Sequence, residues 1–105
     1  MKRPERLGDD VVDGWLARHG SWRREQGHLV RELRTKDYRS SIAIVDAQVE
    51  LCDRLDHHPI LTLGYCELRF ELWTHDRGGL TQLDLDYAGG LDELVRAGFS
   101  DVLVG

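Results

Sequence analysis

The stretch that decides the fold is DYRSSIAIVDAQVELCDRLDHHP, residues 37–59. Apolar residues recur in it at steps of three and four, the spacing of one face of an α-helix. They are Tyr38, Ile42, Val45, Val49 and Cys52, joined by Ile44, Leu51 and Leu55. We therefore predict one long helix from Asp37 to Asp56. Pro59 disfavours helical backbone at the preceding residue, so we expect His57 on the last helical turn and His58 outside the helix.

Segments with the pattern of β-strands flank this helix on both sides. Two short strands, Trp22–Glu25 and Leu29–Thr35, are expected to form a hairpin that turns at Gln26-Gly27. Two more, Leu61–Leu63 and Cys66–Thr74, should form a second hairpin near Gly64. In the last strand Leu68, Phe70 and Leu72 alternate with charged residues, so this apolar set should face the helices.

Helical patterns also occupy both ends of the chain. Residues Asp9 to His19 predict a first helix, and Thr81 can cap a last one, which Gly89-Gly90 should break or weaken. The resulting order α-ββ-α-ββ-α predicts an α+β domain of two layers, a four-stranded antiparallel sheet with helices packed on one face. A chain of 105 residues with 41% hydrophobic content suits a single domain, 1–105, with a loose start over residues 1–8.

Charge and hydropathy exclude several classes of function. A formal net charge of −5 argues against direct nucleic-acid binding. No apolar run is long enough for a membrane span, and the start lacks the apolar core of a secretory signal, so we expect a cytoplasmic protein. In that compartment Cys52 and Cys66 are expected to be reduced packing residues.

The histidines carry the chemistry of this sequence. His57 and His58 are adjacent, and His75 follows at the end of the fourth predicted strand. Imidazoles gain and lose protons near neutral pH. Asp53, four residues before His57 in the predicted helix, would share a face with it and orient its ring. These residues indicate an acid/base site.

The order and spacing of these residues resemble the pterin-4a-carbinolamine dehydratases, also called dimerization-cofactor-like proteins. The family pattern runs from an acidic residue through His-His-Pro and an aromatic residue to another His and then an Asp. This chain supplies, in that order, Asp53, His57, His58, Pro59, Tyr65, His75 and Asp84. Further similarity lies in Gly78-Gly79-Leu80-Thr81, Trp22 and Tyr38, so that the resemblance covers about Trp22 to Ala88.

The chain also departs from the family pattern. Ile60, Leu61 and Leu63 stand where the family commonly has an acidic residue, an aromatic residue and an Asn. Trp73 replaces a small hydroxyl residue before the Thr-His pair. These departures spare the proton-transfer groups and bear on how a substrate fits.

The resemblance implies a hydro-lyase that dehydrates 4a-hydroxytetrahydropterin to quinonoid dihydropterin, in tetrahydrobiopterin recycling after an aromatic amino acid hydroxylase. It implies proton transfer by His57, His58 and His75, with Asp53 orienting His57; which histidine is acid and which is base stays open. The same histidines, Trp73, Thr74 and Asp84 would contact the pterin, although Asp84 could also serve only the start of the last helix. No metal or organic cofactor is implied, and a homodimer or homotetramer is.

Three other interpretations remain open. Three histidines and a carboxylate are also a plausible zinc or iron site, although adjacent histidines rarely direct both rings at one ion. Proteins of this fold also act without catalysis, as dimeric binding or scaffold proteins or as transcription coactivators. An enzyme of the same acid/base type could act on another pterin or carbinolamine. His19 and His28 lie outside the motif and are expected to be surface residues.

Overall fold

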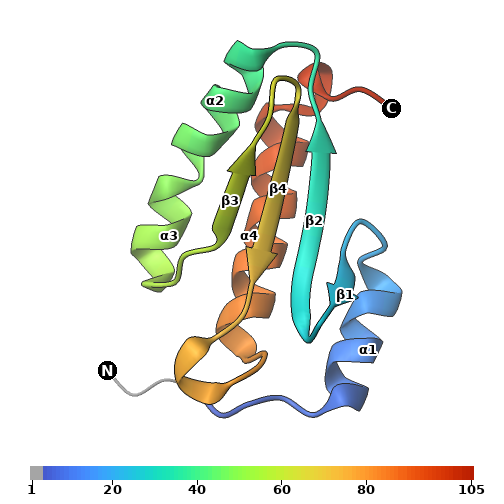
Figure 1. Cartoon of the computed structure of the whole chain (residues 1–105), viewed down its shortest axis with the longest axis vertical. Coiled ribbons are helices and arrows are strands. Elements are labelled where there is room, and N and C mark those ends of the chain that lie inside the picture. Colours follow the sequence, from blue (N-terminus) through green and yellow to red (C-terminus); the bar gives the residue numbers. More distant parts are fainter. Residues whose placement is uncertain (1–3) are drawn as a thin grey trace.

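The computed structural model describes residues 4–105 and contains an antiparallel sheet of four strands in the order β1-β2-β4-β3 (Figure 1). The elements are α1 (Asp9–Arg18), β1 (Arg23–Glu25), β2 (His28–Arg34), α2 (Tyr38–Ala47), α3 (Val49–Leu55), β3 (Ile60–Leu63), β4 (Glu67–Leu72), the 3-10 turn η1 (His75–Arg77), α4 (Gln82–Gly98) and the 3-10 turn η2 (Ser100–Val102). The predicted α+β class with its antiparallel sheet is confirmed. Strand bounds differ from the prediction by one or two residues.

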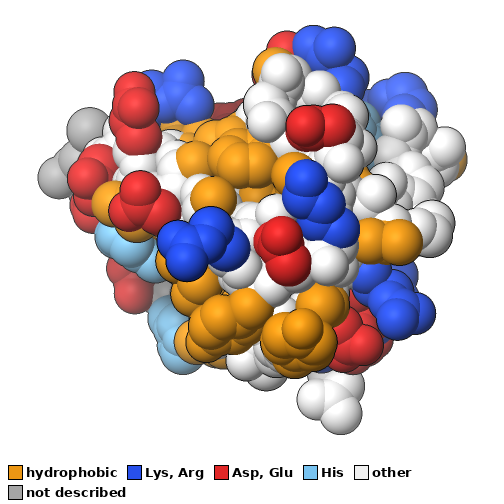
Figure 2. Space-filling model, turned by 90° about the horizontal axis from the view of Figure 1, so that it is seen from above, with side chains coloured by type: hydrophobic (Ala, Val, Ile, Leu, Met, Phe, Trp, Pro, Cys, Tyr) orange, Lys and Arg blue, Asp and Glu red, His pale blue; other side chains and the backbone are white. Residues whose placement is uncertain are grey.

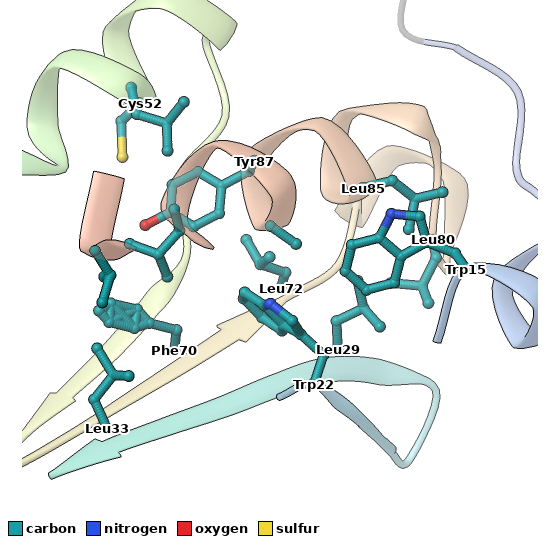
Figure 3. Close-up of a cluster of buried hydrophobic side chains, with 14 of the residues drawn as sticks. Trp15, Trp22, Leu29, Leu33, Cys52, Phe70, Leu72, Leu80, Leu85 and Tyr87 are labelled. Carbon is teal, nitrogen blue, oxygen red and sulfur yellow. The ribbon is translucent and has the colours of Figure 1, made fainter. Parts of the chain in front are cut away.

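The register of the two central strands builds the core. Leu29 and Leu33 of β2 pair with Leu72 and Leu68 of β4, and Phe70 lies between the latter two. All five side chains are buried. Leu29, Leu33, Phe70 and Leu72 point from the sheet towards α4, which carries Tyr87 (Figure 3). Each such burial stabilises the fold by about 1.5–3 kcal/mol. The apolar face of β4 therefore lies where its alternation predicted.

The long helix predicted for residues 37–56 is divided into α2 and α3 at Gln48. The Gln48 side chain is buried, and its Oε1 accepts hydrogen bonds from Tyr87 Oη at 2.6 Å and Cys52 Sγ at 2.9 Å. Burial raises the pKa of Tyr87, and burial followed by the charge of Asp53 raises the pKa of the Cys52 thiol, so both remain protonated donors. A polar side chain thus occupies the inner face at the division. Neither Cys52 nor Cys66 forms a disulfide bond within the described residues.

Part of the predicted apolar stripe on this helix faces outward. Tyr38, Ile42 and Val49 are 47%, 42% and 46% exposed, whereas Ile44 and Leu51 are buried. The periodicity was broad enough to span two faces, and the core uses only one of them. Figure 2, seen from the end where α2 begins, shows apolar patches among charged side chains at that end of the molecule.

Helix α4 continues through Gly89-Gly90 for 17 residues, so the predicted break is wrong. The reason lies in its packing on α3. A Cβ at position 90 would lie 2.7 Å from Leu51 Cδ1, whereas a Cβ at position 89 would meet nothing within 4 Å. Gly90 lets the two helices approach, and the buried contacts offset the low helix propensity of glycine.

The first described residues are held to the body of the protein. Leu7 N donates to Leu80 O at 2.8 Å, and the backbone of Arg6 forms an isolated antiparallel β-bridge with Thr81. The expected loose start is therefore wrong for residues 6 and 7, while residues 1–3 lie outside the described part of the chain. Within residues 4–105, no helix has both the length and the apolar character needed to cross a membrane.

The two glycines give a matched test of this packing. Gly89→Ala should raise the free energy of unfolding by about 0.5–1 kcal/mol, because alanine favours the helix and restricts the unfolded chain. Gly90→Ala should lower it by about 1–3 kcal/mol through overpacking against Leu51. Equilibrium urea unfolding measures both. In a Leu51→Ala background the penalty of Gly90→Ala should largely disappear, and equal effects of the two alanines would contradict this account.

Candidate active site

The helix that leads to the histidines ends earlier than predicted. α3 stops at Leu55, and Asp56 adopts a left-handed conformation with φ 49° and ψ 47°. The backbone N–H of His57 donates to Cys52 O at 3.2 Å, which closes the helix end. His57 therefore lies beyond the helix and does not share a helical face with Asp53. Asp53 is exposed on α3 and makes no hydrogen bond with His57, which corrects the predicted contact.

The carboxylate that contacts His57 belongs to Asp84, in the first turn of α4. His57 Nε2 lies 2.6 Å from Asp84 Oδ1, and the two side chains are 7% and 0% exposed. A buried carboxylate is costly unless every lone pair that faces the protein is paired. His57 supplies one of those partners from a segment 27 residues away.

The second oxygen of Asp84 ties the site to the start of α4 and the end of β4. Asp84 Oδ2 accepts hydrogen bonds from Thr74 Oγ1 at 2.8 Å and from the backbone N–H of Thr81 at 2.9 Å. Thr81 Oγ1 accepts from Leu83 N at 3.2 Å, which completes a capping box, and lies 2.9 Å from Thr74 Oγ1. Thr81 therefore caps α4, as predicted, and Asp84 completes that cap. Asp84 also orients the ring of His57.

This contact determines which nitrogen of His57 carries the proton in the neutral ring. An ionised carboxylate only accepts hydrogen bonds, so Nε2 must donate and Nδ1 keeps the lone pair. Nδ1 has no hydrogen-bond partner within the described chain and is not sealed from solvent. In the neutral ring, Nδ1 of His57 thus keeps a free lone pair while Nε2 is held by the buried carboxylate of Asp84.

A pocket of about 160 Å³ joins most of the residues singled out in the sequence. Its lining is Asp56, His57, His58, Trp73, Thr74, His75 and Asp76. Asp84 lies behind this lining, bonded to His57 and Thr74, and Asp53 is absent from it. The three motif histidines, which come from the loop after α3 and from η1, therefore meet at one end of the sheet (Figure 1).

The ring of Trp73 lies between two histidines. Its centroid is 4.0 Å from that of His28, with an interplanar angle of 4°, and 4.5 Å from that of His75, with an angle of 45°. His28 was expected to be a surface residue outside the motif; its side chain is 26% exposed and stacks on Trp73. The register of β2 with β4 explains the contact, because the pairs Leu29↔Leu72 and Val30↔Glu71 set residue 28 opposite residue 73.

The other departures from the family pattern lie away from the pocket. Ile60 and Leu63 are 52% and 37% exposed on β3, and Leu61 is partly buried; none of the three lines the pocket. Tyr65, at the tip of the β3–β4 hairpin, is 77% exposed. Of the four departures, only Trp73 reaches the histidines.

Two further observations concern other possible sites on the protein. Among residues 4–105, no group of three His, Cys, Asp or Glu side chains is placed to hold one metal ion. A larger hollow of about 610 Å³ runs along β2 beside Leu103 and Val104. No histidine lines that hollow, so we assign the candidate site by its chemistry and not by volume.

The fold and the site define a small α+β protein with a histidine pocket suited to acid/base chemistry. The family model of pterin 4 alpha carbinolamine dehydratase matches residues 5–94, and this chain belongs to that family. The resemblance carried by the histidine motif is thereby confirmed.

Similar proteins cover nearly the same length. A relative from Metallosphaera sedula, provisionally named a pterin-4-alpha-carbinolamine dehydratase, is 43% identical over 91 residues, which span 87% of this chain and 95% of the relative. One from Natronomonas pharaonis with the same provisional name is 36% identical over 92 residues, 88% of this chain and 98% of its own.

Two solved structures share the fold. A transcriptional coactivator/pterin dehydratase from Brucella melitensis matches with a TM-score of 0.81 at 23% identity, over 86% of this chain and 98% of its own. A pterin dehydratase-like protein identified as a RuBisCO assembly factor in the alpha-carboxysome matches with a TM-score of 0.60 at 25% identity, over 78% of this chain and 95% of its own. The fold thus occurs in proteins described by quite different activities.

Substitution of two aspartates separates the predicted partner of His57 from the observed one. Asp84→Asn should turn an amide donor toward Nε2, so that the neutral ring carries its proton on Nδ1 instead, and should lower the free energy of unfolding by about 1–3 kcal/mol. Asp53→Asn should change neither. Long-range ¹H–¹⁵N NMR of the imidazole nitrogens reports the tautomer. An unchanged tautomer in folded Asp84→Asn would contradict the assignment.

Proposed function

We propose that this protein dehydrates 4a-hydroxytetrahydropterin to quinonoid dihydropterin. The observation that carries the proposal is the His57–Asp84 contact at the base of a pocket that His58 and His75 also line. Family membership supports the substrate class. Such a reaction follows the use of a tetrahydropterin by an aromatic amino acid hydroxylase, and that functional link, like the cytoplasmic location, stays a prediction.

His57 is the residue best suited to be the general base. Its Nε2–H is held by Asp84, so Nδ1 can take the proton from the pterin ring nitrogen N5. The imidazolium that results is stabilised by the buried carboxylate, which lowers the cost of proton transfer. Asp84 acts here as a positioning residue and does not touch the substrate.

His75 is the counterpart that we assign as general acid. It is exposed on η1 at the rim of the pocket and can exchange protons with solvent. As the N5–H bond breaks, its electron pair forms the C4a–N5 double bond. The bond from C4a to the hydroxyl group breaks at the same time, and a proton from His75 turns the departing hydroxide into water. The products are quinonoid dihydropterin and one water molecule.

The remaining residues of the pocket bind and enclose the substrate. His58 is exposed beside His57 and can donate a hydrogen bond to the polar edge of the pterin, while Thr74 holds Asp84 in place. Trp73 offers an aromatic wall for a flat ring. Every proton transfer in this scheme is made by a side chain of the chain itself, and we therefore propose a hydro-lyase that needs no cofactor.

The test is a stopped-flow assay of 4a-hydroxytetrahydropterin breakdown. His57→Ala and His75→Ala should each lower kcat by about 10²–10⁴, the usual contribution of a positioned acid or base. Asp84→Asn should lower kcat through His57, and Asp53→Asn should leave it at the native value. Circular dichroism checks that each variant is folded. Absence of any acceleration by native protein would overturn the proposed activity.

A binding role is the second candidate function. The resemblance to a RuBisCO assembly factor and to a transcriptional coactivator favours it, since both are similar in fold to this chain. If the assay is silent, this candidate becomes the leading one, and a stable protein partner should then be found.

We also propose that the chain forms a homodimer or a higher homo-oligomer through the β3 side of the sheet. β3 is an edge strand, and exposed Ile60 lies on it. Ile42 and Val49 are exposed on α2 and α3, the two helices drawn next to β3 in Figure 1. Edge strands with apolar surroundings are stabilised by pairing with a second copy.

Two lysine substitutions test this interface. Val49→Lys should shift the assembly towards monomer, because a charge would be buried between copies. Val11→Lys, at a similarly exposed position on α1 (49% against 46%), should leave the assembly unchanged. Analytical ultracentrifugation measures the mass. A native protein that is monomeric at micromolar concentration, or a Val49→Lys protein that keeps the native mass, would rule out this interface.

A further inference from the structure

The wall of the pocket is held in place by a residue outside the histidine motif. His28 and Trp73 stack almost in parallel, with centroids 4.0 Å apart and planes at 4°. His28 Nδ1 lies 2.6 Å from Glu71 Oε2, and both side chains are 26% exposed. The Trp73 ring is therefore backed by an imidazole that is itself fixed by a carboxylate.

The backbone determines where His28 lies. Gln26 and Gly27 have φ values of 50° and 80°, which form the two-residue turn between β1 and β2. His28 is the first residue after that turn and pairs with Glu25. The register of β2 with β4 puts Val30 opposite Glu71, so His28 lies diagonally from Glu71 and directly across from Trp73. This end of β2 lies beside the end of β4 (Figure 1).

With one face against His28, the Trp73 ring can meet a ligand only on its other side. The pocket lies on that side, because Trp73 and His75 line it and His28 does not. The indole therefore cannot retreat from the pocket without displacing His28. The pocket it bounds measures about 160 Å³, below the 300–1,000 Å³ usual for small-molecule sites.

We propose that His28, anchored by Glu71, is a positioning residue that holds Trp73 as a rigid wall and thereby selects pterins with a small side chain. The inference rests on the proposed function, because it concerns the substrate of the same pocket. A pterin ring that carries only a methyl group needs little more space than the ring itself. A long side chain directed at Trp73 would need the indole to move, and the stack opposes that movement.

A second histidine–tryptophan stack shows that such a pair does not by itself define a site. His19 lies on Trp15 with centroids 3.9 Å apart and planes at 8°. Trp15 is only 8% exposed and belongs to the core, so its position is fixed by packing on several sides. Trp73 is partly buried at the edge of the core and borders a pocket, and His28 covers one face of its ring. His19 is therefore a matched control.

The experiment compares two carbinolamine substrates that differ at one ring carbon. One carries a methyl group, and the other carries the long aminobenzoylglutamate chain. Native protein should show a kcat/KM at least about tenfold higher for the methyl compound. Trp73→Ser should bring the two values close together, mainly by lowering KM for the long-chain compound, since the acid and base are untouched.

The role of His28 is read from the same ratio. His28→Ala should reduce the selectivity about threefold, the size of one cross-strand pair, and should have no further effect in a Trp73→Ser background. His19→Ala should leave the ratio at its native value. The ratio is independent of the amount of folded enzyme, so a purely structural role of His28 would not change it.

Two outcomes would overturn the inference. One is a native protein without preference between the substrates, and the other is a His28→Ala protein with native selectivity. If no variant turns over either compound, the proposed function fails separately, and the ratio of Kd values for the corresponding 7,8-dihydropterins, from fluorescence titration, decides the inference instead. Absence of binding to both dihydropterins would reject the inference as well.

Discussion

One buried carboxylate organises this protein. Asp84 is fully buried and accepts hydrogen bonds from His57, from Thr74 and from the backbone of Thr81. Those partners come from the loop after α3, the end of β4 and the cap of α4. A buried negative charge is tolerated only when it is fully paired. The hydrogen bonds that pair this carboxylate therefore cap the start of α4 and join α4 to the end of β4. They also fix the ring of His57, the histidine that we propose as the base.

Trp73 and His28 show how the pocket differs from a mere collection of reactive groups. The motif histidines are the groups proposed for proton transfer, whereas the position of Trp73 in the pocket wall follows from a hairpin turn and from the register of β2 with β4. Ile60 and Leu63, which also depart from the family pattern, are exposed on the edge strand β3 and do not line the pocket. The proposal on substrate choice and the proposal on assembly thus rest on different departures from the pattern.

The sequence predicted the strands and the order of elements because alternation and turn residues are local signals. It also brought His57, His58, His75, Trp73 and Thr74 into one site through the family pattern. It failed where long-range contacts decide. Asp53 was chosen over Asp84 because helical spacing was assumed to reach His57, but the left-handed turn at Asp56 ends the helix first. The predicted helix break at Gly89-Gly90 was wrong because Leu51, far away in sequence, packs so closely on α4 that only a glycine fits at position 90.

The double role of Asp84 has a consequence for how such proteins diverge. A lineage that keeps the fold for binding alone has no further use for proton transfer, so the exposed His58 and His75 are free to drift. Asp84 is not, because Thr81 and the start of α4 still need an acceptor at that position. An intact aspartate is therefore a marker of shared architecture, and only the histidines that face the pocket distinguish a descendant that retains chemistry from one that has lost it.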